Sequence, residues 1–233
     1  MIKKISSHIE RHFRTPKTLR NIVLGIADGL TVPFALAAAI SGALYSNNIV
    51  IVASLAEIAA GTISMGLGGY LVAKSDAEHY KNEERREHKE VKELPETELA
   101  EVKGILRSYG LQDAEANLVA TALQNRPQDW VDFMMRFELG LEHPHPREAR
   151  NSAFTLGISY AIGGIIPLSP YFFIDNTQSA LIASSLLTLS ALFVFGYVKG
   201  VYTSNAPFKS AIQTTGIGGL AAATAFTIAR LIT

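Results

Sequence analysis

NIVLGIADGLTVPFALAAAISGA, residues 21–43, decides the fold of this chain. It is as long as the roughly 20 mostly apolar residues that a membrane-spanning helix requires. Its one charge is Asp28, and a carboxylate inside a span costs about 2.5–3.5 kcal/mol on insertion scales. A cation, a proton or a buried polar partner must therefore offset that cost. The alternative is that Asp28 lies near the membrane surface, where the preceding basic segment neutralises it.

Charge is distributed very unevenly along the 233 residues. Residues 21–73 and 152–232 are almost free of charge, whereas residues 74–150 hold most of the acids and bases. The pattern predicts an all-α membrane protein with five transmembrane helices and a charged helical insert between spans 2 and 3. The loop charges and acid spacings described below predict that this insert is a cytoplasmic helical metal-binding domain. The predicted domains are a basic amphipathic cytoplasmic helix at 1–20, spans 1–2 at 21–73, the insert at 74–150, and spans 3–5 at 151–233.

The predicted helices follow from apolar runs and from proline and glycine punctuation. Spans 2 to 5 are expected near 49–72, 150–173, 179–198 and 210–231. The insert helices are expected near 76–93, 95–110, 113–124 and 127–142.

The basic residues of the connecting segments orient the chain. The N-terminal segment, the insert and the loop at 199–209 carry Lys and Arg, whereas the turns at 45–48 and 174–178 carry none. Basic loops stay on the cytoplasmic side of a membrane. We therefore expect the N-terminus and the insert in the cytoplasm, and the C-terminus on the opposite side.

Three residues of the first two spans are candidates for an ion pathway. Asp28 and Met65 lie at a similar depth, roughly 10–12 Å from the cytoplasmic end of their spans at 1.5 Å per residue. Glu57 lies two turns from Met65. A carboxylate with a thioether suits a borderline divalent cation such as Fe²⁺, although ordinary packing is the alternative for Met65.

The insert carries acids that share helix faces. Glu87 and Glu90 are three residues apart, as are Glu98 and Glu101, and residues at this spacing lie side by side on a helix. Met134, Met135 and Glu138 form a further group. The spacing favours a shared site for Fe²⁺, Mn²⁺ or Zn²⁺, and the alternative is that the acids are simply solvated.

Other chemistries are disfavoured. The chain has no cysteine, so disulfides and thiolate metal sites are excluded. No glycine-rich phosphate loop is present, so ATP is not implied, and an insert that is as acidic as it is basic disfavours nucleic acid. A membrane-bound metal oxidase would need Glu-x-x-His pairs on helices, which the insert lacks.

Four stretches together resemble the vacuolar iron transporter family of proton-coupled Fe²⁺/Mn²⁺ carriers. They are GIADGLTVPFALAAAISGA (25–43), AEIAAGTISMGLGGYLVAKSDAEHY (56–80), WVDFMMRFELGLEHPHP (130–146) and SYAIGGIIPLSPYFF (159–173). The resemblance implies five spans, a cytoplasmic metal-binding domain and a homodimer. It assigns Asp28, Glu57 and Met65 to the membrane pathway. It assigns the cytoplasmic cluster to Glu87, Glu90, Glu98, Glu101, Met134, Met135 and Glu138.

The expected function is therefore not enzymatic. We expect a secondary transporter of the lipid bilayer that removes divalent metal from the cytoplasm in exchange for protons, with its pathway at a two-fold interface between the first spans. The membrane is expected to be the plasma membrane or a vacuole-type membrane. The alternative is a metal sensor or scaffold that transports nothing.

Overall fold

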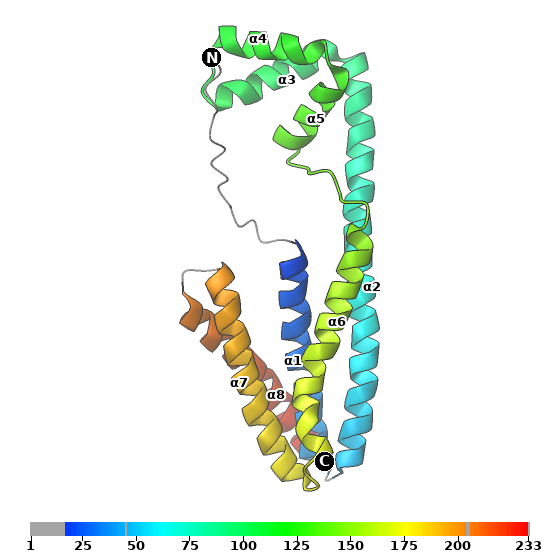
Figure 1. Ribbon diagram of the computed structural model, residues 1–233, viewed down its shortest axis with the longest axis vertical. Coiled ribbons are helices and arrows are strands. Elements are labelled where there is room, and N and C mark those ends of the chain that lie inside the picture. Colours follow the sequence, from blue (N-terminus) through cyan, green and yellow to red (C-terminus); the bar gives the residue numbers. More distant parts are fainter. Residues whose placement is uncertain (1–16, 45, 204–205, 233) are drawn as a thin grey trace, which may run out of the picture. The chain divides into compact units, whose positions relative to one another are not determined.

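The computed structural model describes residues 17–44, 46–203 and 206–232, which are almost entirely helical and contain no β-strand. The helices in order are α1 (Lys17–Ala43), α2 (Asn47–Glu93), α3 (Pro95–Ser108), α4 (Asp113–Gln124), α5 (Pro127–Phe137), α6 (Glu148–Leu168), the 3-10 helix η1 (Ser169–Phe172), α7 (Thr177–Thr203) and α8 (Pro207–Ile232) (Figure 1). Two compact units result. One contains the chain up to Tyr70 and from Arg150 onward, and the other is Leu71–Ala149.

Five helices of the described residues are long and apolar enough to cross a membrane, which confirms the predicted number of spans. They are α1, α2, α6 with η1, α7 and α8. Of the basic helix predicted at 1–20, residues 1–16 lie outside the described residues, and Lys17–Arg20 form the first turn of α1. Pro33 lies within α1, which remains one continuous helix.

Helix α2 is one uninterrupted helix of 47 residues. The sequence predicted two helices here, separated near Lys74-Ser75-Asp76. No glycine or proline stands at this point, and Lys and Asp at exposed positions are tolerated in a helix interior. The change from apolar to charged residues therefore alters the surroundings of the helix without ending it.

Glycines let α6 approach α1 and α2 at backbone distance within the first unit. A side chain on Gly25 would lie 2.7 Å from the Leu156 carbonyl oxygen, and one on Gly29 would collide with the backbone of Tyr160. From the other side, a side chain on Gly163 would lie 2.9 Å from the Ile26 carbonyl oxygen. Small residues at such crossings provide the van der Waals contact that holds helices together in lipid.

Polar side chains join the end of α1 to the segments around it. The hydroxyls of Ser41 and Tyr171 lie 2.9 Å apart in a buried hydrogen bond, and the Gln178 amide donates to the Ser41 carbonyl at 3.2 Å. The Asn47 amide donates to the Asp175 carbonyl at 3.1 Å. These bonds join the end of α1 and the start of α2 to η1 and the start of α7.

Apolar side chains from α2, α3, α4 and α5 form the core of the second unit. Its buried members include Tyr80, Val102, Trp130, Met134 and Met135. Figure 1 shows α3, α4 and α5 gathered beside one end of α2.

Helix α5 is shorter than predicted. It ends at Phe137 and not at residue 142, because Gly140 adopts a φ of +65° and turns the chain away from the helix. Glycine enters this left-handed region without the steric cost of a side chain. The early end makes Glu138 the residue that follows the last turn.

The backbone contact between α1 and α6 gives a testable prediction. We expect Gly29→Ala to lower the thermal stability of the purified protein in detergent, by about 1–3 kcal/mol, because the new methyl group meets the backbone of Tyr160. Gly68→Ala is the matched control, since nothing lies within 4 Å of a side chain there. Equal melting temperatures for the two variants would contradict the described crossing.

Candidate metal sites

The first candidate site lies in the membrane unit and centres on Glu57. Helix α2 carries Glu57 into the apolar interior, where the Tyr160 hydroxyl of α6 donates a hydrogen bond to its Oε1 atom. The ring of Tyr160 occupies the space that a side chain on Gly61 would fill, so the phenol reaches the acid only because residue 61 is glycine. The Oε2 atom of Glu57 is buried and has no hydrogen-bond partner among the described residues.

Asp28 lies close to the same tyrosine. Its neighbour Gly29 packs on the Tyr160 backbone, and the Asp28 carboxylate is within electrostatic range of the phenol. In the described part of the chain Asp28 makes no hydrogen bond or ion pair. An acid without a partner in an apolar span is suited to take up a proton or a cation.

Met65 is half-buried on α2, two turns beyond Glu57. Its thioether forms no hydrogen bond to either acid within the described residues. The structure therefore joins Glu57 to Tyr160, and Tyr160 is the functional candidate that the sequence analysis missed. The available signal was that a tyrosine buried in an apolar span needs a partner for its hydroxyl group.

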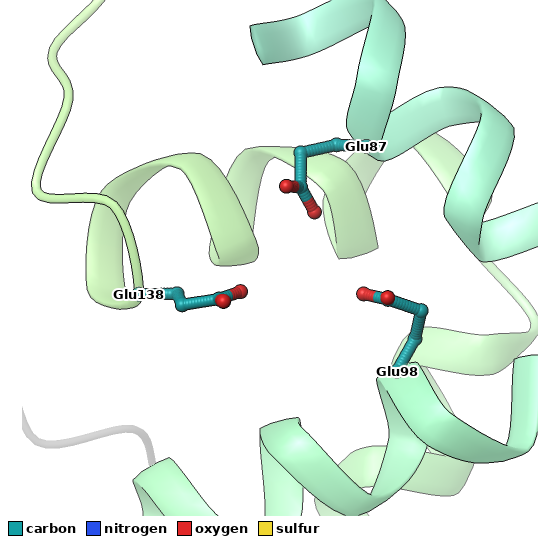
Figure 2. A group of neighbouring side chains, drawn as sticks. All are labelled: Glu87, Glu98 and Glu138. Carbon is teal, nitrogen blue, oxygen red and sulfur yellow. The ribbon is translucent and has the colours of Figure 1, made fainter. Parts of the chain in front are cut away.

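The second candidate site is a group of three carboxylates in the Leu71–Ala149 unit. Glu87 of α2, Glu98 of α3 and Glu138 after α5 each offer one carboxylate oxygen, and these oxygens lie within 4.8 Å of one another. Figure 2 shows the three side chains pointing toward a common centre. Glu87 and Glu98 are only 2% and 4% exposed, and the Oε2 atom of each has no hydrogen-bond partner among the described residues.

Burial and mutual repulsion weaken the acidity of this group. Burial, followed by the charges of Glu138 and Glu90, raises the pKa of Glu87 to about 7. Burial, followed by the charges of Glu101 and Glu87, raises the pKa of Glu98 to about 7. The pKa of Glu138 is raised as well, first by burial and then by Glu101.

These pKa values have a consequence for stability. Between pH 4.5 and about 7, Glu87 and Glu98 hold more protons in the folded protein than in the unfolded chain. Their contribution to the free energy of unfolding is therefore favourable at low pH and is lost as the pH rises through this window. A divalent cation among the ionised carboxylates would offset the loss above pH 7.

The structure divides the acids that the sequence placed in one cluster. Glu90 is 35% exposed and forms an ion pair with Arg86 at 3.6 Å, and Glu101 is exposed. Both raise the pKa of the central carboxylates, so both lie near them, but neither belongs to the convergent group of three.

Met134 and Met135 lie in the apolar core of the same unit. They are 0% and 1% exposed and pack with Trp130 in the apolar cluster of that unit. The unit that carries the three carboxylates therefore also buries two thioethers. Oxygen donors suit Fe²⁺, Mn²⁺ and similar divalent ions, and sulfur favours the softer ones.

Comparison with known proteins shows the family of this chain. The model of the VIT family matches residues 19–230. Vacuolar iron transporter 1 of Eucalyptus grandis is 53% identical over 98% of this chain and 92% of its own length. The protein of the same name from Arabidopsis thaliana is 52% identical, with 98% and 91% covered. Protein CCC1 of Saccharomyces cerevisiae is 35% identical, with 93% and 70% covered. The chain is therefore an integral membrane protein that belongs to the VIT family.

Proposed function

We propose that this chain is a secondary transporter, and not an enzyme, that moves Fe²⁺ out of the cytoplasm in exchange for protons. The observation that carries the proposal is the convergence of Glu87, Glu98 and Glu138 in a chain that also carries two half-buried acids, Asp28 and Glu57, within its apolar helices. Relatives that are about half identical over nearly the whole chain are named vacuolar iron transporters, which supports iron as the cargo. Mn²⁺ and Zn²⁺ are further substrates that the same donor atoms would accept.

The carboxylate cluster would serve as the loading site. Glu87, Glu98 and Glu138 would hold the ion, with Glu90 and Glu101 adding negative charge nearby. Because the pKa values of Glu87 and Glu98 are about 7, an arriving divalent ion displaces protons from them near neutral pH. Met134 and Met135 would supply the thioethers that favour Fe²⁺ over harder ions.

Asp28, Glu57 and Met65 would form the transport pathway in the membrane. A proton and a metal ion compete for the same carboxylate, so binding of the ion releases the proton and protonation from the far side releases the ion. Tyr160 donates to Glu57 and holds one of its oxygens in place. This competition is sufficient for antiport if the pathway opens alternately to the two sides.

The chain would work as a homodimer whose pathway lies between the two copies of α1. The N-terminus and the insert would lie in the cytoplasm, because basic residues concentrate in the segments of that side. The membrane would be of the vacuolar type, by analogy with the relatives, or the plasma membrane in a cell without vacuoles.

The first prediction from this mechanism concerns Asp28. Asp28→Asn keeps the size and the hydrogen-bonding capacity of the side chain but cannot exchange a proton. We expect it to abolish both Fe²⁺ uptake and the accompanying proton flux in sealed vesicles, whereas Asp28→Glu retains part of both. Asp175→Asn is the control, because that acid is exposed in the connection before α7. Uphill Fe²⁺ transport by Asp28→Asn would refute the coupling role.

The second prediction concerns the pH dependence of loading. A group with a pKa of about 7 is roughly one-tenth ionised at pH 6 and nine-tenths ionised at pH 8. We therefore expect the affinity for Fe²⁺ to fall by about 10- to 100-fold from pH 8 to pH 6, with protons released on binding. Anaerobic calorimetry of the full chain in buffers of different ionisation enthalpy measures both quantities.

Matched variants test the assignment of that pH dependence. Glu98→Gln should weaken Fe²⁺ binding at pH 8 and flatten its pH dependence, because one of the titrating groups is gone. Glu96→Gln, which changes an exposed acid of the same helix, should behave as the unmodified protein does. If Glu98→Gln leaves both the affinity and the pH profile unchanged, the convergent carboxylates are not the loading site.

A further inference from the structure

Arg86 is the one basic residue whose ion pairs, among the described residues, reach the carboxylate cluster. Its Nη2 atom lies 3.8 Å from Oε1 of Glu87, and its Nε atom lies 3.6 Å from Oε2 of Glu90. The same Nη2 atom lies closer to Glu83, at 2.8 Å from Oε2. The preceding residue, Arg85, is exposed and takes part in no such pair among the described residues.

The partners of Arg86 fall into two kinds. Glu87 belongs to the convergent group of three, and Glu90 lies beside it. Glu83 stands one turn earlier on α2 and outside that group, with its side chain 18% exposed. The guanidinium group therefore lies between an acid that faces the metal site and an acid that does not.

A guanidinium group in this position must oppose an arriving cation. It carries a full positive charge at every physiological pH, so it cannot withdraw by losing a proton, as a carboxylic acid can. A divalent ion that binds Glu87 meets both the repulsion of this charge and a partly engaged carboxylate. The side chain of Arg86 is 52% exposed, so it has room to move away from Glu87 and keep its closer contact with Glu83 when the ion arrives.

We propose that Arg86 competes with the transported ion for the carboxylates and so limits the affinity of the carboxylate cluster. Glu83 holds the Arg86 guanidinium group when the ion is bound. This inference rests on the proposed loading role of the cluster and adds the residues that set its affinity. A loading site has to bind strongly enough to capture an ion and weakly enough to pass it on. The positive charge of Arg86, held beside the carboxylates, keeps the affinity for the ion from becoming too high for its release.

The first test measures Fe²⁺ binding to the full-length protein by anaerobic calorimetry at pH 8. Arg86→Gln should bind about fivefold more tightly than the unmodified protein, the size of effect expected for one partly exposed ion pair. Arg85→Gln, which removes the same charge one position earlier, should change the affinity little. Arg86→Lys keeps the charge and should stay close to the unmodified protein.

The second test removes the anchor. Glu83→Gln should weaken Fe²⁺ binding, because Arg86 loses its alternative partner and engages Glu87 and Glu90 more fully. In the Arg86→Gln background the same Glu83 substitution should have no effect. Glu83 also lies 3.8 Å from Nδ1 of His79, and an effect through that residue would persist in both backgrounds. Equal effects in the two backgrounds would therefore refute the anchoring role.

The outcomes separate this inference from the function on which it rests. If Glu98→Gln weakens Fe²⁺ binding while Arg86→Gln and Arg85→Gln bind Fe²⁺ equally well, the loading role of the cluster is supported and the competitor role of Arg86 is refuted. Weaker binding by Arg86→Gln would also refute it, since Arg86 would then support the site. If neither Glu98→Gln nor Arg86→Gln changes Fe²⁺ binding, the loading site itself is wrong.

Discussion

A carboxylate that is removed from water must gain a partner or a proton, and this constraint acts in both units of the chain. Within the spans, Glu57 accepts a hydrogen bond from the Tyr160 hydroxyl on one oxygen, and its other oxygen has no hydrogen-bond partner in the part of the chain that the structure describes. In the second unit, Glu87 and Glu98 are buried side by side. Their pKa values are raised because ionising a buried carboxylate next to another acid is unfavourable. In each unit at least one carboxylate oxygen lacks a partner among the described residues, and a bound cation or proton would supply one.

The sequence was sufficient to predict the number of membrane-spanning helices, because each span requires only a long enough run of apolar residues. It was less informative at helix ends. The continuity of α2 through Lys74 and Asp76 could not be read from polarity, since polarity reports the surroundings of a helix and not its termination. The end of α5 at Phe137 depends on the positive φ angle of Gly140. A glycine can adopt this conformation but does not have to, so its presence in the sequence does not predict the end of the helix.

The sequence predicted a shared site among the acids of the second unit, but spacing alone could not say which of their oxygen atoms converge. Spacing along a helix reports which residues share a face, so it paired Glu87 with Glu90 and Glu98 with Glu101. The convergent oxygens instead come from three different helical segments, and that depends on how α2, α3 and α5 pack. The pairing of Tyr160 with Glu57 joins α6 to α2, so spacing along a single helix could not predict the partner of this tyrosine.

The glycine crossing of α1 and α6 restricts how a carrier built on this unit can move. Where backbones touch at Gly25, Gly29 and Gly163, a relative rotation of the two helices would drive carbonyl groups into one another. Helices α7 and α8 also approach at backbone distance, at Gly196 and Gly200. Helix α1 instead meets α8 through side chains, with Phe34 and Phe226 in one apolar cluster, and such an interface can slide by changing rotamers. Alternating access would therefore carry α1 and α6 together as one rigid body and α7 and α8 as another, with the shear where α1 meets α8.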